Sequence, residues 1–206
     1  MKLSARHPIV LVFIVVGAVA GSPGQCGSYP QPMSQEQVLS VLRDSVKAAP
    51  QERDGACITF AIRQLENKYS GEATILLVDY LDFARPLDDA EQAGFMSHGP
   101  PTIGNRYPAT STLMSFGKPA VPVLLDAIAD KASTLVQQNA TYTLMEIFRE
   151  QPEKGIEILR RKSLEGSAVQ SARLRAAAQE ALRWCGRSHM ERCKLAEENI
   201  PSKEPN

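Results

Sequence analysis

A short internal repeat constrains the fold of this chain more than any other feature. Residues 109–114 have the sequence ATSTLM, and residues 140–145 have the sequence ATYTLM, 31 residues later. In each copy a helix-breaking stretch follows, and then a second apolar run, at 120–128 and 155–159. Two helices repeated at such a period are typical of stacked helical-repeat proteins. The sequence therefore predicts an all-α protein, a short α-solenoid of about four helix pairs.

Two weaker copies of the same pattern extend the repeat in both directions. The earlier copy comprises residues 61–65 and 73–81, and the later one begins at residue 178. The first helices of the four units thus start near residues 61, 109, 140 and 178, with spacings of 48, 31 and 38 residues. Each unit has an alanine where two helices approach closely, and leucines three to four positions later on the buried stripe. Because one helix pair cannot bury both of its faces, the units are expected to stack.

The boundary between the two helices of the unit at 109–130 has clear local signals. Gly117 fits the end of the first helix, and Pro119 fits the start of the second. Pro122 still falls in the first turn of that second helix, where a missing N–H costs little. These residues predict a helix break at 117–119.

The sequence around this break resembles a known repeat. Residues 113–128 (LMSFGKPAVPVLLDAI) are similar to a HEAT repeat in the element G-x-x-A-V-P-x-L-L and in Asp126, which follows the paired leucines. The resemblance covers residues 57–83 and 107–185. It implies a HEAT-like α-solenoid, a fold that presents a concave binding surface built from its second helices. An irregular helical bundle is the alternative that the residues leave open.

The chain divides into four expected parts. Residues 1–20 are expected to be a signal peptide, and residues 21–33 a flexible linker rich in Pro, Gly and Ser. The HEAT-like helical repeat domain is expected to span residues 34–196, and residues 197–206 a polar, disordered tail.

The repeat domain opens with a clear helix signal. Residues 34–37 (SQEQ) have the pattern of a capping box. Apolar residues follow at helical spacing, namely Val38, Leu39, Leu42 and Val46. The pattern predicts a first helix over residues 34–48.

The first twenty residues have the three parts of a secretory signal. Lys2 and Arg6 make the start positive, residues 9–20 are uncharged and mostly apolar, and residues 18–20 (AVA) fit a small-residue cleavage site. The apolar run of 12 residues is shorter than the ~20 residues of a membrane span. We therefore expect an exported protein, either periplasmic or secreted. An uncleaved N-terminal anchor is the alternative.

Charge gives little reason to expect nucleic acid or a membrane surface as a partner. Removal of residues 1–20 takes away two of 23 basic residues and no acid, which leaves a formal charge of −2. No global field then recruits polyanions, and no later segment is long and apolar enough to span a bilayer. Basic residues do exceed acidic ones over 149–194, by 11 to 6. This stretch is interpreted as a solvated outer face, and the alternative is a surface for an anionic partner.

The chain contains four cysteines, Cys26, Cys57, Cys185 and Cys193. An even number in an oxidising compartment indicates disulfides. We favour Cys185–Cys193 because the two are close in the chain, which leaves the other two to pair; free buried thiols are the alternative. His189 lies midway between Cys185 and Cys193, so a continuous helix would place three potential zinc ligands on one face. A disulfide instead needs a turn at 186–188, because its Cα atoms must lie within ~7 Å. We expect the disulfide, no metal and no cofactor.

The segment between the first two repeat units is unusually long. Residues 84–108 contain four prolines and three glycines. Loops of this length in a compact domain are usually functional or disordered. The candidate binding residues are its polar and aromatic side chains, Asp88, Asp89, His98, Arg106 and Tyr107. A solvated loop without function is the alternative.

No catalytic pattern stands out in the sequence. The chain lacks H-E-x-x-H, G-x-S-x-G and a phosphate-binding Gly-Lys-Ser/Thr loop. We therefore expect a non-catalytic protein-binding or scaffolding module of the cell envelope or extracellular space, with a protein as partner. The alternative is an enzyme, or the accessory domain of one, with its site at residues 84–108. That alternative requires the polar residues of the loop to converge with groups of the repeat surface.

Overall fold

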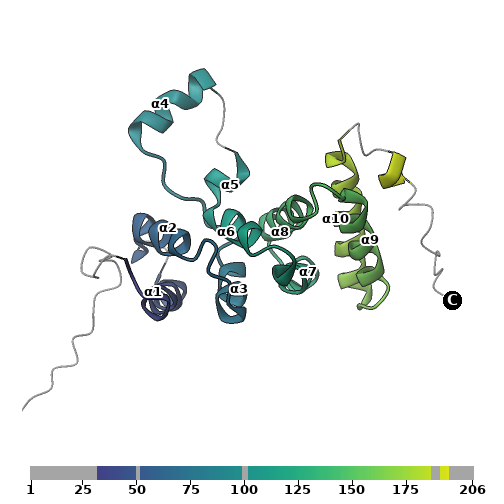
Figure 1. Ribbon diagram of the computed structural model, residues 1–206, viewed down its shortest axis with the longest axis horizontal. Helices are drawn as coiled ribbons and strands as arrows, with labels where there is room; N and C mark the ends of the chain where they lie inside the picture. The colour runs from purple at the N-terminus through teal and green to yellow at the C-terminus, as the bar shows by residue number, and fades with distance from the viewer. Residues whose placement is uncertain (1–31, 50–51, 99–101, 187–190, 195–206) are drawn as a thin grey trace, which may run out of the picture.

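The protein is all-helical in every part that the structure, a computed structural model, describes (Figure 1). The described residues are 32–49, 52–98, 102–186 and 191–194, and the side chains of residues 93 and 95–98 are not among them. The expected signal peptide, nearly all of the expected linker, Cys26 and the expected tail therefore lie outside the described residues.

Within these residues the chain forms the helices α1 to α10 and the 3-10 helix η3, and residues 191–194 are also helical. The first half contains α1 (Gln35–Lys47), α2 (Gly55–Gln64), α3 (Gly71–Val78), α4 (Asp89–His98) and α5 (Ile103–Arg106). The second half contains α6 (Pro108–Phe116), the 3-10 helix η3 (Lys118–Ala120), α7 (Val121–Asp130), α8 (Thr134–Ile147), α9 (Pro152–Ser163) and α10 (Ala168–Trp184). The expectation of an all-α chain is confirmed.

Two of the longer helices begin at capping boxes. At the start of α1, the Gln37 backbone N–H donates to Ser34 Oγ and the Ser34 N–H donates to Gln37 Oε1, at 3.2 and 2.8 Å. This confirms the first helix expected over 34–48. Ser167 and Gln170 form the same reciprocal pair at the start of α10. Helix α10 therefore starts at Ala168, ten residues before the position that the alanine pattern indicates.

The break expected at 117–119 is present. Gly117 ends α6 with a φ of 68°, in the left-handed region that favours glycine. The short helix η3 follows, and Pro122 lies in the first turn of α7. The chain bends by 113° between α6 and the helical residues after Gly117.

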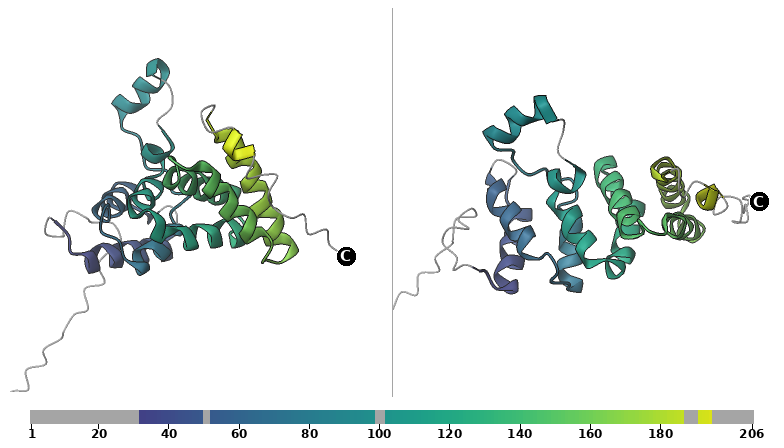
Figure 2. Two further views of the ribbon diagram at one scale, coloured as in Figure 1. Left: turned by 45° about the vertical axis from the view of Figure 1, so that its right-hand side comes forward. Right: turned by 45° about the horizontal axis from the view of Figure 1, so that its top comes forward.

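The helices outside α4 and α5 form a body with two rows (Figures 1 and 2). In one row α2, α6 and α8 contact one another in that order, and in the other α1, α3 and α7 do so. Contacts of α1 with α2, α3 with α6 and α7 with α8 join the two rows. At the C-terminal end, α10 packs against α7 and α8, and α9 packs chiefly against α10.

The pairing of helices differs from the units that the sequence pattern indicated. That pattern paired α2 with α3, α6 with α7 and α8 with α9. The most extensive contacts instead join α1 to α2, α7 to α8 and α9 to α10. At the centre of the body, the bend after Gly117 explains why α7 does not pair with α6. It directs α7 away from α6 and toward α8.

The repeated residues occupy equivalent buried positions. Ala109 of α6 and Ala140 of α8 are both fully buried, and these two helices contact each other. Leu113 and Leu144, four positions later in each copy, are also fully buried. The 31-residue repeat therefore marks buried positions in two neighbouring helices of the same row.

Buried polar side chains connect neighbouring helices through backbone carbonyls. Thr112 Oγ1 of α6 donates to the Ile62 carbonyl of α2 at 3.2 Å. Asn139 Nδ2 of α8 donates to the carbonyl of Leu81 at 2.6 Å, just beyond α3. The Ile62 carbonyl also accepts a hydrogen bond from the Leu65 N–H at 3.0 Å, so the bond from Thr112 is its second. The bonds from Thr112 and Asn139 fix the spacing along and between the rows.

No single helix among the described residues is both long and apolar enough to span a membrane. The bent pair of α6 and residues 118–130 meets that criterion by length and composition together. Leu113, Leu124 and Ile128 of this pair are fully buried in the core.

Candidate functional site

The segment expected as a loop at 84–108 contains two helices. Residues 85–107 hold α4 and α5, and α4 stands away from the body (Figures 1 and 2). We call residues 85–107 the projection. The expected long loop at 84–108 thus includes the two helices α4 and α5.

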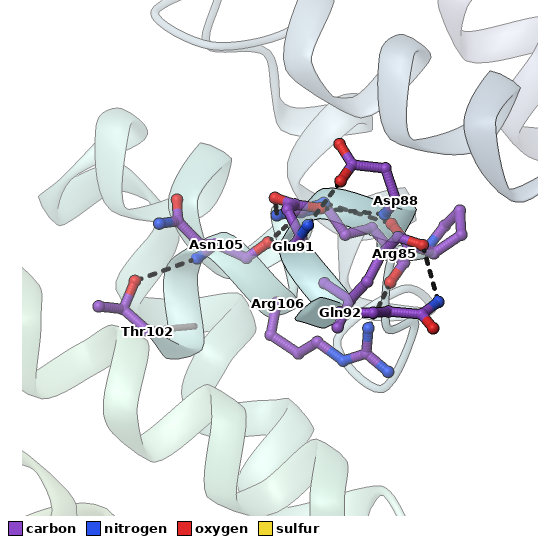
Figure 3. Close-up of polar contacts among 9 residues, drawn as sticks. Arg85, Asp88, Glu91, Gln92, Thr102, Asn105 and Arg106 are labelled. Atoms are coloured by element: carbon purple, nitrogen blue, oxygen red, sulfur yellow. Dashed lines mark hydrogen bonds and ion pairs between the residues drawn. The ribbon is translucent and has the colours of Figure 1, made fainter. Parts of the chain in front are cut away.

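Reciprocal hydrogen bonds close the base of the projection (Figure 3). The Arg85 N–H donates to the Arg106 carbonyl at 2.9 Å, and Arg106 Nη1 donates to the Arg85 carbonyl at 2.6 Å. Arg85 Nε also donates to the carbonyl of Asn105 at 2.6 Å. The two ends of the projection thus meet where it joins the body.

An ion pair ties the first turn of α4 to this base. The Arg85 guanidinium donates to both carboxylate oxygens of Glu91, with one Nη1–Oε2 distance of 2.7 Å. The hydrogen bond from Arg85 is the main cause that lowers the pKa of Glu91 to about 2, and it raises the pKa of Arg85. Asp88 accepts a hydrogen bond from the Glu91 N–H at 2.7 Å and so caps α4.

The structure brings together two of the five candidate residues from the sequence. Asp88 and Arg106 belong to the network around Arg85, whereas Asp89 is exposed in the first turn of α4. Tyr107 is half-buried, and its carbonyl accepts a hydrogen bond from Thr110. The side chain of His98 lies outside the described residues.

Sequence reasoning missed the two residues at the centre of this network, Arg85 and Glu91. A signal for Glu91 was present, because Asp88 followed three residues later by Glu91 has the form of a capping box. The Asp88 N–H does donate to Glu91 Oε2, at 3.2 Å. No comparable local signal indicates Arg85, whose partners Asn105 and Arg106 lie about twenty residues away in the chain.

Two pockets flank α5. The aromatic pocket, of about 350 Å³, lies between α5, α8 and the end of α10 and is lined by Ile103, Tyr142, Met145, Glu146, Arg149 and Trp184. The Arg106 pocket, of about 420 Å³, lies between α2 and the base of the projection and is lined by Phe83, Arg85, Pro86, Leu87, Gln92 and Arg106. Both volumes fall in the range of ~300–1,000 Å³ that is usual for binding sites.

The aromatic pocket combines an aromatic pair with an ion pair. The rings of Tyr142 and Trp184 meet edge to face, with centroids 5.9 Å apart. Burial and the neighbouring charge of Glu146 raise the pKa of Tyr142. Glu146 pairs with Arg149, and Trp184 remains 39% exposed. Part of the aromatic surface of this pair is therefore open to a binding partner and is not covered by the rest of the described chain.

A disulfide lies beside the aromatic pocket, because Cys185 stands between the lining residues Trp184 and Gly186. Cys185 and Cys193 are bonded, with their Cα atoms 6.8 Å apart, and both are buried. Helix α10 ends at Trp184 and Cys185 is extended, so α10 does not continue through Cys185 as one helix. Residues 187 and 188 of the expected turn lie outside the described residues. The Cys185 and Cys193 sulfurs, which the zinc alternative needs as ligands, are therefore bonded to each other. Cys57 is also disulfide-bonded, and Cys26, its expected partner, lies outside the described residues.

Basic residues of the 149–194 stretch pair with nearby acids along their own helices or turns. Such pairs are Arg149–Glu146, Arg161–Glu157, Lys162–Glu165, Arg183–Glu180 and Lys194–Glu191. Pairs of this kind are typical of solvated helix surfaces. This arrangement favours a solvated outer face over a continuous anion-binding surface.

The chain was compared with protein-family models, with curated proteins and with solved structures, and none of them matches it. The geometry of the two pockets is therefore the basis for a functional proposal.

Proposed function

We propose that this chain is a short HEAT-like α-solenoid that acts as a non-catalytic protein-binding or scaffolding module of the cell envelope or extracellular space. The two rows of helices and the equivalent burial of Ala109 and Ala140 support the solenoid part of this proposal. An array built in this way has an extended surface relative to its length, which suits recognition of other proteins.

The observation that carries the binding proposal is the composition of the aromatic pocket. Tyr, Trp, Met and Arg are the residue types enriched at protein interfaces, and Trp, Tyr and Arg dominate binding energies there. Tyr142, Met145, Arg149 and Trp184 line this one pocket. The Cys185–Cys193 bond next to Trp184 restrains the chain at the pocket's edge, and such restraint before binding reduces its entropic cost.

The geometry of the projection supports binding better than catalysis. Arg85, Asp88, Glu91 and Arg106 bond to one another and to the backbone at its base. An acid or base that acts on a substrate needs to reach the substrate proton. Asp88 and Glu91 instead serve as a helix cap and as the counterion of Arg85.

The disulfides support the proposed location. Cys185–Cys193 and the disulfide of Cys57 are bonds that persist in oxidising compartments. Intact mass of the protein from its native source tests export. A mature chain that starts at or near Gly21 is expected, and a chain that retains residues 1–20 would favour a membrane anchor.

Paired affinity capture from the native cell envelope tests the binding proposal. The baits are the wild type, Trp184→Ala and the control Tyr69→Ala, which removes an aromatic side chain that is 52% exposed elsewhere on the surface. A protein retained by the wild type and by the control, and lost with Trp184→Ala, is expected. Equal capture by all three baits would contradict the proposal. Because Trp184 is the only tryptophan in the chain, its emission should also shift when the captured partner is added.

A further inference from the structure

We infer that the Arg106 pocket binds a carboxylate side chain in an acidic segment of the protein partner, with an apolar neighbour of that acid packed beside it. This inference rests on the proposed protein-binding function and adds the chemistry of the partner. It concerns the surface at the base of the projection, between Phe83 and Arg106.

The two arginines that line this pocket differ in their partners. All three side-chain nitrogens of Arg85 donate hydrogen bonds, to Asn105, Pro86 and Glu91, and its charge is neutralised by Glu91. Among the described residues, the side chain of Arg106 donates only through Nη1, to the Arg85 carbonyl. Within the part of the chain that the structure describes, Arg106 has no ion pair, and its Nε and Nη2 donate no hydrogen bond. A half-buried guanidinium with unused donors is a ready partner for an anion.

The acids of the projection do not supply that anion. Among the described residues, those that line the pocket include no carboxylate. In Figure 3 the carboxylate of Asp88 and the guanidinium of Arg106 point to opposite sides of the network, and Gln92 lies on the side of Arg106. Glu91 is engaged with Arg85. The lining therefore presents one uncompensated positive charge together with the amide of Gln92.

The remaining lining fits an apolar side chain next to the acid. Phe83 and Leu87 are half-buried and Pro86 is exposed, so apolar surface borders the guanidinium. Gly55 of α2 forms part of the same wall, and a Cβ at this position would lie 3.1 Å from Pro86 Cδ. A single charge surrounded by apolar groups matches a carboxylate, which has one charge, better than a phosphate group, which has about two.

Helix α5 relates this pocket to the aromatic pocket. Ile103, at the start of α5, lines the aromatic pocket, and Arg106, at its end, lines the Arg106 pocket. One partner segment that crosses α5 would contact both pockets. The expected segment thus carries an apolar anchor for the Tyr142–Trp184 pair and an acid for Arg106.

Peptide display on the full oxidised chain tests this inference. A library of random peptides, each fused through its C-terminus so that no free terminal carboxylate is present, is selected for binding to the wild type. The selected peptides are expected to contain Asp or Glu beside an apolar residue. Affinities are then measured for the wild type, Arg106→Gln, Arg106→Lys and the control Arg175→Gln, which removes an exposed cation of α10 outside the pocket.

The inference requires a coupled loss. Arg106→Gln, and replacement of the peptide acid by its amide, should each weaken binding about tenfold or more, as expected for loss of a charge-assisted hydrogen bond. The two changes together should cost no more than either one alone. Arg106→Lys should retain part of the affinity, because it keeps the charge, and Arg175→Gln should retain all of it. Unchanged melting of Arg106→Gln shows that the variant is folded, and the peptide variants leave the protein untouched.

Other outcomes separate the two proposals. Suppose that the selected peptides bind Trp184→Ala more weakly, but that neither Arg106→Gln nor replacement of the peptide acid weakens binding. This result would overturn the present inference and leave the protein-binding function standing. Binding that inorganic phosphate abolishes equally for acidic and amide peptides would also overturn it. A selection without any peptide sensitive to Trp184→Ala or Arg106→Gln would overturn both proposals.

Discussion

The body and the projection are stabilised by different interactions. In the body, neighbouring helices pack through fully buried apolar residues, such as Leu113 and Leu144 at equivalent positions of α6 and α8. In the projection, the contacts that close residues 85–107 are hydrogen bonds and the ion pair of Arg85 with Glu91. One chain thus combines a region held by the hydrophobic effect with a region held by polar contacts at its base.

This difference predicts how each region responds to mutation and to solution conditions. Apolar burial depends little on pH, whereas a partly exposed ion pair is sensitive to pH and is screened by salt. The polar contacts at its base also hold the projection in place without an additional hydrophobic core. The projection can therefore respond locally while the body remains folded, which is common for segments that bind ligands.

The largest expected effect is on the body. Leu113→Ala and Leu144→Ala should each lower the free energy of unfolding by about 2–5 kcal/mol, because each leaves a cavity in the core. Denaturant unfolding followed by circular dichroism measures this loss. The control is Leu164→Ala, at a position that is 42% exposed, and it should change stability by less than about 1 kcal/mol. Wild-type stability for Leu113→Ala and Leu144→Ala would refute their placement in the core.

Local sequence signals predicted those features of the body that are determined by residues close together in the chain. The repeated alanines and leucines, the capping box at Ser34 and the break at Gly117 were found in this way. Which helix packs on which depends on bends of the chain, and the sequence pattern paired the helices differently. The start of α10 was misplaced although Ser167 and Gln170 repeat the signal seen at Ser34.

The candidate site was less predictable from the sequence than the body. Its location at 84–108 and two participants, Asp88 and Arg106, followed from length and composition. The central partners did not, because Arg85 meets Asn105 and Arg106 only after the chain has folded back through α4. The aromatic pocket was missed for the same reason, since Tyr142 and Trp184 lie on different helices and meet only through packing.

The second effect concerns the disulfide at the end of the body. Replacing Cys185 and Cys193 by Ser should cost about 2–3 kcal/mol, because the bond closes a short segment of the unfolded chain. The loss should be accompanied by a change in Trp184 emission, since this residue directly precedes Cys185. Thermal unfolding and fluorescence measure the two responses. Unchanged stability together with unchanged emission would show that the bond does not support the pocket wall.

A smaller and local effect is expected when the projection is acidified. The pKa of Glu91 is about 2 in the folded chain, below its ordinary value of 4.5. The ion pair with Arg85 therefore contributes fully above about pH 4.5, and its contribution is lost as the pH falls from 4.5 toward 2. A carbon-13 NMR titration of the Glu91 carboxyl group measures this pKa directly. In Arg85→Gln the pKa should return toward 4.5, and an unchanged value in that variant would contradict the assigned cause.

The smallest effect is expected on the outer face of the body. Arg161 pairs with Glu157 on α9, and both side chains are largely exposed. Arg161→Gln should therefore lower stability by only roughly 0.3–0.5 kcal/mol, and less at high salt. Chemical denaturation at two salt concentrations checks this value. A loss above about 1 kcal/mol would show that this surface is buried against another part of the molecule.

Native-state hydrogen exchange compares the body and the projection most directly. The amides of Leu113 and Leu144 should exchange only by opening of the whole body, with a free energy equal to that of global unfolding. The described amides of α4 should exchange through a local opening of much lower free energy, and Arg85→Gln should speed their exchange without affecting Leu113 or Leu144. If the α4 amides are instead protected as strongly as Leu113, and lose protection only when the body unfolds, the two regions form a single cooperative unit and the account is contradicted.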